Sequence, residues 1–236
     1  MSSDNPPAAR QLPLQLPHHP AMTRADFLVG EANRQAIALI DGWPAWPGPA
    51  VLIAGPAGSG KSHLVEIWRE ASRAAVVAAA GLSDADVVPL VGAGAVALED
   101  VHAGPLDEAA LFHLLNLAAE RGAPVLLTSR LRASGLPLRL ADLASRLRAA
   151  RLVELGEPDD DLLRRVLVKL FADRQIVIDG AVVDYIVVRM ERSLQAASAI
   201  VADLDREALA AGGAVTRRLA AAALARVFDR EPEDGE

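Results

Sequence analysis

The sequence predicts an α/β protein in which a five-stranded, mostly parallel sheet is covered by helices and followed by an all-helical segment. Two observations carry this prediction. Between residues 51 and 155, short apolar runs alternate with longer segments whose apolar residues recur every three or four positions, a pattern typical of strands alternating with covering helices. After residue 155 the pattern is helical throughout. Ligands of such sheets bind beyond the carboxyl ends of the strands.

Strands are expected at residues 51–54, 75–79, 95–98, 124–128 and 152–155. Residues 61–72 and 106–121 are expected to form covering helices, because Leu, Val, Ile and Phe follow helical spacing there. Later helices are expected at residues 159–174, 180–190, 193–210 and 216–228. Gly156-Glu157-Pro158 interrupts the first pattern, and the three aspartates that follow suit the start of a helix.

These breaks divide the chain into four parts. Residues 1–22 are expected to be a flexible tail, 23–155 an α/β domain, 156–230 a helical domain and 231–236 an acidic tail.

The composition is that of a globular, soluble chain. Its 236 residues include 24 basic and 31 acidic side chains, giving a net charge of −7, and 52% are hydrophobic. The absence of Cys excludes a disulfide scaffold.

The long uncharged run at residues 42–60 contains four prolines, which argues against a membrane span, and the amino terminus lacks a signal-peptide pattern. We therefore expect a cytoplasmic protein. Its acidity argues against broad DNA binding but leaves room for a local basic patch.

A glycine-rich loop with the pattern G-x-x-x-x-G-K-[ST] joins the first predicted strand to the next helix. Its members are Gly55, Pro56, Ala57, Gly58, Ser59, Gly60, Lys61 and Ser62. In this context the pattern indicates a phosphate-binding loop. Backbone N–H groups and the helix start surround the phosphates, Lys61 adds a positive charge and the Ser62 hydroxyl is suited to Mg²⁺.

An acidic pair, Glu99-Asp100, ends the third predicted strand. Here one carboxylate, Glu99, would support Mg²⁺ together with Ser62, and its neighbour would orient the attacking water. Ser129, or Thr128 before it, could reach the same site with its hydroxyl, or instead cap a turn.

Four stretches resemble the AAA+ ATPases of the DnaA type, and within them the Hda-like regulators. They are residues 26–34 (DFLVGEANR), 60–64 (GKSHL), the Glu99-Asp100 pair and 142–147 (DLASRL). The first and last are more specific to this group than the phosphate loop. The resemblance implies an AAA+ P-loop NTPase fold with a helical lid.

The same resemblance implies a set of ligands, partners and residue roles. It implies binding of ADP or ATP with Mg²⁺, homo-oligomers, and DnaA as a partner. The residues carried over are Phe27, Leu28, Val29 and His63 at the nucleotide, Arg146 as an arginine finger acting on a neighbouring subunit, and Arg192 as a nucleotide-sensing lid arginine.

An apolar island in the amino-terminal tail, residues 11–16 (QLPLQL), resembles the peptide that docks on the sliding clamp, the beta subunit of DNA polymerase III. The resemblance implies that Leu12, Leu14 and Leu16 fill apolar pockets while Gln11 makes a polar anchor. The alternatives are a tail interrupted by proline and a strand that packs on the domain.

The expected function is therefore negative regulation of chromosomal replication initiation, by stimulating hydrolysis of DnaA-bound ATP. No DNA-reading module follows the lid helices, so sequence-specific DNA binding is not expected. Glu99 stands where the family usually has Asp, which predicts weak or absent intrinsic ATPase activity. Two alternatives stay open: an autonomous ATPase acting as a helicase loader or transposition helper, and a scaffold that only tethers a partner to the clamp.

Overall fold

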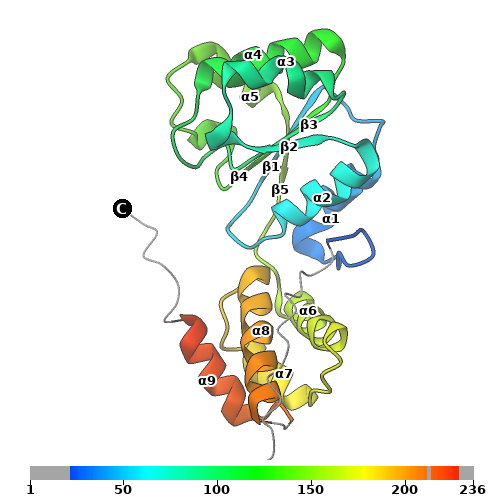
Figure 1. Cartoon of the computed structure of the whole chain (residues 1–236), viewed down its shortest axis with the longest axis vertical. Coiled ribbons are helices and arrows are strands. Elements are labelled where there is room, and N and C mark those ends of the chain that lie inside the picture. The colour runs from blue at the N-terminus through cyan, green and yellow to red at the C-terminus, as the bar shows by residue number, and fades with distance from the viewer. Residues whose placement is uncertain (1–21, 212–213, 229–236) are drawn as a thin grey trace, which may run out of the picture.

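A computed structural model of the chain describes residues 22–211 and 214–228. It has an α/β part built on one sheet and a helical part that follows it in the chain (Figure 1). The expected clamp-docking peptide and acidic tail lie outside the described residues. Within the described residues, no helix is long and apolar enough to cross a membrane.

The sheet is five-stranded and parallel, in the order β2-β3-β4-β1-β5, which confirms the predicted fold class. The strands are β1 (Ala50–Ala54), β2 (Ala75–Ala78), β3 (Val96–Glu99), β4 (Val125–Ser129) and β5 (Arg151–Glu154). Each overlaps a predicted strand, with ends that differ by at most one residue. In the centre Leu52 of β1 pairs with Leu127 of β4 and Leu152 of β5, so the carboxyl ends of neighbouring strands share one edge.

Helices cover both faces of the sheet. They are α1 (Arg34–Asp41), α2 (Lys61–Ser72), α3 (Asp84–Gly92), α4 (Glu108–Arg121) and α5 (Ala141–Ala149), with short 3-10 turns at Glu31–Asn33, Ala79–Gly81 and Ala133–Gly135. Because successive strand residues point to opposite faces, Leu52 and Leu127 pack with α3, α4 and α5, whereas Ile53 and Leu126 pack with α1 and α2. The sheet is therefore buried on both sides.

The helical part has an apolar core of its own. Its helices are α6 (Asp160–Asp173), α7 (Gly180–Val187), α8 (Leu194–Ala211) and α9 (Arg217–Phe228). Phe171 of α6 is fully buried among apolar residues of the other three helices. Helix α7 ends three residues earlier than residues 180–190 predict.

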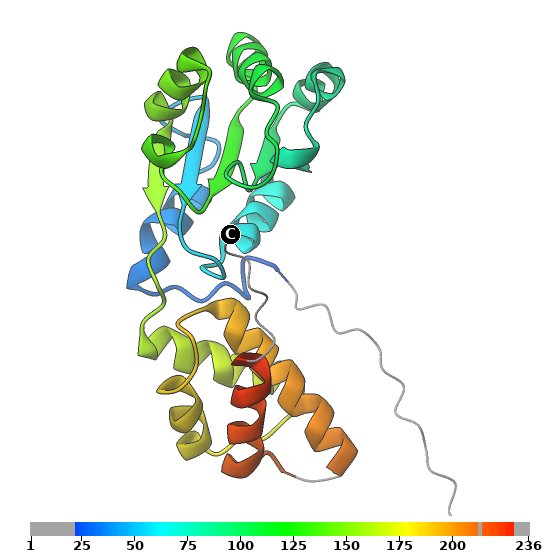
Figure 2. The same ribbon diagram turned by 90° about the vertical axis from the view of Figure 1, so that its left-hand side faces the viewer.

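Contacts between the two parts gather at the carboxyl edge of the sheet. In Figure 2 the strand arrows point toward α6 and α8. The Leu194 N–H at the start of α8 donates to the Gly58 carbonyl at 2.9 Å, and Arg165 of α6 donates to the Val29 carbonyl at 3.0 Å. The phosphate-loop pattern thus lies where the two parts meet.

Candidate functional site

A cleft of about 460 Å³ opens between the carboxyl edge of the sheet and helices α6 and α8. Its walls are formed by the segment before α1, the glycine-rich loop, the ends of two strands and the facing sides of α6 and α8. This is the position at which the fold class predicts a ligand site.

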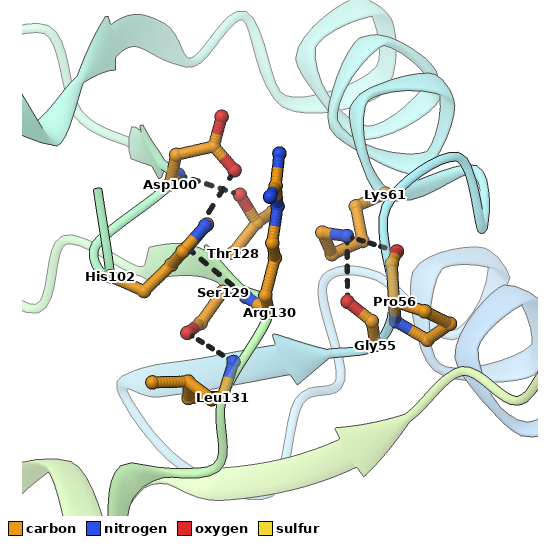
Figure 3. A network of polar contacts seen from close by, with 9 residues as sticks. All are labelled: Gly55, Pro56, Lys61, Asp100, His102, Thr128, Ser129, Arg130 and Leu131. Atoms are coloured by element: carbon orange, nitrogen blue, oxygen red, sulfur yellow. Dashed lines mark hydrogen bonds and ion pairs between the residues drawn. The ribbon is translucent and has the colours of Figure 1, made fainter. Parts of the chain in front are cut away.

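The glycine-rich loop holds the Lys61 ammonium at the floor of this cleft. Lys61 Nζ donates to the carbonyl oxygens of Gly55 at 2.8 Å and Pro56 at 2.7 Å (Figure 3). Burial lowers the pKa of Lys61, while the nearby carboxylates of Asp100 and Glu99 act in the opposite direction. An ammonium bound only to two carbonyls can exchange either of them for a phosphate oxygen, a stronger, charge-assisted partner.

Gly58 is the point where this loop touches the start of α8. Its φ is +63°, and a Cβ there would overlap the Ser193 hydroxyl and lie 3.0 Å from Gln195 Cβ. Ser193 is buried and its hydroxyl accepts from the N–H of Gln195 and of Ala196, both at 3.2 Å. The loop and the cap of α8 therefore fit together only without a side chain at residue 58.

We expect Gly58→Ala to lower the free energy of unfolding by about 3 kcal/mol, because backbone strain of about 1 kcal/mol adds to an overlap worth about 2 kcal/mol. Urea unfolding measures the loss. Gly122→Ala is the matched control, since Gly122 has a φ of +66° with no atom within 4 Å of the added Cβ. Equal losses in both variants would contradict a tight contact between the loop and α8.

Of the acidic pair, Asp100 lines the cleft across from Lys61, whereas Glu99 before it is not among the residues that line the cleft. Asp100 has a φ of +58°, and its N–H donates to Thr128 Oγ1 at 3.0 Å, which ties the end of β3 to the end of β4. The Oε1 atom of Glu99 is buried and has no hydrogen-bond partner among the described residues. A buried carboxylate oxygen without a donor suits a cation, so the predicted pairing of Glu99 with Mg²⁺ fits this geometry.

His102 stands beside Asp100 in the neutral form. Its Nδ1 atom accepts from the Arg130 N–H at 3.1 Å, so the proton lies on the other ring nitrogen. Burial lowers the pKa of His102. The 3.9 Å separation between this Nδ1 and an Asp100 oxygen is consequently not an ion pair.

Neither of the two hydroxyl candidates at the end of β4 lines the cleft. Thr128 Oγ1 accepts from Asp100, and Ser129 Oγ accepts from the Leu131 N–H at 2.9 Å. Ser129 therefore caps the turn after β4, whereas Thr128 joins the ends of β3 and β4.

The apolar end of the cleft contains three of the four residues carried over for the nucleotide. Phe27 is buried and meets the His63 ring edge-on at 5.1 Å, and Leu28 lies beside them. His63 Nε2 donates to the Thr23 carbonyl at 2.9 Å, and burial lowers its pKa. Val29 does not line this cleft, and its carbonyl binds Arg165. These residues form a neutral pocket next to a charged floor.

The Val-Gly-x-x-Asn pattern at residues 29–33, within the stretch DFLVGEANR, has a structural reason. The Asn33 side chain is buried, accepts from the Gly30 N–H at 2.9 Å and donates to the Leu28 carbonyl at 3.0 Å. One amide group therefore fixes the turn that presents Phe27 and Leu28 to the cleft.

The structure places Arg192 outside the cleft. Its guanidinium pairs with Asp160 at the start of α6, with 2.8 Å between Nη2 and Oδ1, and donates to the Pro158 carbonyl at 3.3 Å. Gln195, three residues further along, lines the cleft beside Gly58. The described side chains of this segment that lie against the phosphate loop, Ser193, Leu194 and Gln195, are therefore uncharged.

Sequence reasoning missed several residues of the cleft. Arg130 directly follows β4 and lines the cleft together with Lys61 and Asp100, between which it stands in Figure 3. Its position after a strand adjacent to β1 was an available signal. Asp26 and Lys169, 143 positions apart in the chain, gave no such signal.

The Lys169–Asp26 pair joins α6 to the segment before α1 at 2.8 Å. Hydrogen bonds from Lys169, and to a lesser extent from Thr23, lower the pKa of Asp26. The carboxylate is thus favoured in the folded state, and its contribution to stability is complete above the ordinary Asp pKa and disappears as pH falls through the lowered value.

We expect Asp26→Asn to lower the free energy of unfolding at pH 7 by about 1 kcal/mol, since both side chains are only partly exposed. The difference from the wild-type protein should shrink below about pH 4. Denaturant unfolding at both pH values measures this. Asp41→Asn, which removes a more exposed pair with Arg24, should cost less. A loss that stays constant as pH falls would contradict the assignment.

Arg146 lies on α5, at the opposite edge of the sheet. It is exposed, lies 5.6 Å from the centre of the Phe112 ring and has no carboxylate partner within the described ranges. It lines a hollow of about 580 Å³ with Pro49 and Arg151, next to the amino ends of β1 and β5. A five-residue strand, roughly 16 Å long, separates this edge from the phosphate-loop edge. Arg146 therefore cannot act on phosphates bound in its own cleft.

Comparison with solved structures shows that this fold is shared with a replication initiator and with a branch migration motor. Domain III of the Thermotoga maritima replication initiation protein DnaA superposes with a TM-score of 0.72 at 17% identity, covering 90% of this chain and 99% of that one. The Thermotoga maritima RuvB Holliday junction branch migration motor gives 0.67 at 16% identity, over 84% and 70% of the two chains.

AMPPCP-bound DnaA from Aquifex aeolicus gives a TM-score of 0.66 at 19% identity, covering 78% of this chain and 65% of that one. The chain thus spans about two thirds of this longer DnaA. No protein-family model and no curated protein sequence matches the chain. At these identities the likeness establishes the shared fold.

Proposed function

We propose that this protein is an Hda-like negative regulator of replication initiation that binds an adenine nucleotide, docks on the sliding clamp and stimulates hydrolysis of ATP held by DnaA. The observation that carries the proposal is the separation of two half-sites. A phosphate loop lies at one edge of the sheet, and the unpaired Arg146 lies at the other.

The cleft supports the nucleotide part of the proposal. Lys61 and the loop amides would bind the phosphates, and the pocket of Phe27, Leu28 and His63 would take the base. Ser62 and the orphaned Glu99 oxygen would hold Mg²⁺, whose bound charge offsets that of the phosphates. The fold shared with AMPPCP-bound DnaA supports an adenine nucleotide.

Arg146 supports action on a partner rather than on the protein's own nucleotide. A guanidinium supplied by a neighbouring subunit stabilises the charge that develops during phosphoryl transfer. Arg146 is exposed, and the length of a strand separates it from the phosphate loop of its own chain. It therefore suits that role in a DnaA complex or in a homo-oligomer. The expected weak intrinsic ATPase activity is consistent with a site that lacks its own arginine finger.

The test measures hydrolysis of radiolabelled ATP pre-bound to DnaA, with DNA-loaded clamp and this protein added separately or together. We expect stimulation only when both are present. Leu14→Ala, in the clamp-docking peptide, should abolish it without changing ADP binding. Failure of the folded wild-type protein to stimulate hydrolysis would refute the regulator assignment.

One observation favours a second function. Asp100 and Arg130 line the cleft together with Lys61, a charged set that also suits an autonomous ATPase of the loader type. Such a protein would hydrolyse ATP without DnaA, at rates near the enzyme median of about 10 s⁻¹. The regulator would not.

A further inference from the structure

Two arginines of the helical part lie against the ring of one tyrosine. The guanidinium carbon of Arg189 lies 4.0 Å from the centre of the Tyr185 ring, and that of Arg217 lies 4.5 Å from it. Tyr185 belongs to α7, and Arg217 is the first residue of α9. None of the three lines the nucleotide cleft or the hollow at Arg146.

The arginines of this cluster lack carboxylate partners. Across residues 22–211 and 214–228, no ion pair involves Arg189, Arg217 or the adjacent Arg218. Within the described residues, the other arginines of the helical part are paired with aspartates: Arg164, Arg165, Arg174, Arg192, Arg206 and Arg226. Among the described arginines of this part, Arg189, Arg217 and Arg218 are therefore those whose positive charge no paired carboxylate neutralises.

The first turn of α9 carries basic residues, although acidic residues are the ones favoured at the amino end of a helix. Arg217 and Arg218 occupy its first turn, where the helix dipole is already positive and basic side chains are unfavourable. Helix stability does not explain two arginines at this end. Their placement raises the local positive potential still further.

The tyrosine ring restricts both guanidinium groups. A cation over an aromatic face is held by the ring quadrupole, so Arg189 and Arg217 lose less side-chain freedom on binding a ligand than free arginines would. Their planar N–H forks match the oxygens of a phosphate group. The cluster thus presents two pre-positioned, always-charged phosphate ligands.

We propose that Tyr185, Arg189, Arg217 and Arg218 form a binding site for the phosphate backbone of nucleic acid, independent of base sequence. A protein partner is less well matched, because protein hot spots lie in desolvated pockets, whereas Arg189, Arg217 and Arg218 are exposed. Backbone contacts need only accessible positive charge. The proposal does not rest on the proposed regulatory function.

The test uses full-length protein and fluorescence anisotropy with two labelled probes, an oligothymidylate and a mixed-sequence DNA duplex, at about 50 mM salt. The double variant Arg189→Gln/Arg217→Gln should bind both probes at least about tenfold more weakly. For the duplex, the slope of log affinity against log salt concentration should become shallower by nearly 2. Preference for one probe would identify single- or double-stranded nucleic acid as the ligand.

The control is Arg73→Gln/Arg121→Gln, which removes the same charge from two exposed arginines of the α/β part that likewise lack carboxylate partners in the described chain. It should bind DNA like the wild-type protein. Unchanged thermal unfolding and ADP binding would show that the cluster variant is folded. No binding by the wild-type protein, or equal weakening in both variants, would overturn the proposal. So would tighter cluster-dependent binding of labelled polyglutamate than of DNA, since it would indicate an acidic protein partner.

Discussion

Lys61→Met is expected to lower the affinity for adenine nucleotide about 100-fold. The substitution removes charge-assisted hydrogen bonds to phosphate, which contribute about 1.5–3 kcal/mol. Methionine keeps the length and apolar contacts of the lysine stem in this buried position. The effect should therefore fall on ligand binding, with a smaller effect on folding from the lost bonds to Gly55 and Pro56.

Titration with a fluorescent ADP analogue in the presence of Mg²⁺ measures this loss. Arg69→Met is the matched control, because Arg69 belongs to the same helix but is half exposed, pairs with Glu66 at 2.7 Å and does not line the cleft. It removes the same charge and should change the affinity less than about twofold. Comparable losses in the two variants would mean that the cleft is not the nucleotide site.

The elements that the sequence predicts well are those with a local signal. Each strand is a short apolar run. Helix α2 begins and ends at the predicted residues, and the glycine-rich loop before it sets its start. Helices α1, α3 and α5 were not predicted. They are short, and α3 contains Pro89, which ordinarily marks the end of a helix. Their positions depend on packing against the sheet.

The charged floor of the cleft was predictable for a related reason. In a parallel sheet, residues that follow different strands meet at one edge, which brings Lys61 and Asp100 together from sequence positions far apart. The same rule applied to β4 points to Arg130. Its place after the predicted strand and its hydroxyl led instead to Ser129, whose side chain turns back to cap its own turn.

The residues that the helical part contributes to the cleft could not be predicted from the sequence. Arg192 and Gln195 are three residues apart, and only the docking of α8 on Gly58 determines which of them faces the loop. The ion pair at Asp26 likewise exists because α6 packs beside the segment before α1. Such contacts depend on how the two parts are placed, for which a single sequence carries no periodic signal.

The clearest test of action on a partner is Arg146→Ala. An arginine finger acting in trans contributes about 10³–10⁵ in rate, so we expect the stimulated hydrolysis of DnaA-bound ATP to fall by about 1,000-fold or to the unstimulated level. Because Arg146 is exposed and its described contact is the Phe112 ring, the free energy of unfolding should change by less than about 1 kcal/mol. The protein's own ADP affinity should not change, since its cleft lies at the other edge of the sheet.

Arg148→Ala provides the control from the same helix. Arg148 is exposed, has no carboxylate partner in the described chain and does not line the hollow beside Arg146, so its loss should leave stimulation within about threefold of wild type. Single-turnover hydrolysis with DNA-loaded clamp compares the variants. If Arg146→Ala stimulated as well as Arg148→Ala, the protein would be a scaffold that tethers DnaA to the clamp without completing its active site. A selective loss in Arg146→Ala, with ADP affinity retained, requires that Arg146 act on a nucleotide bound by another subunit.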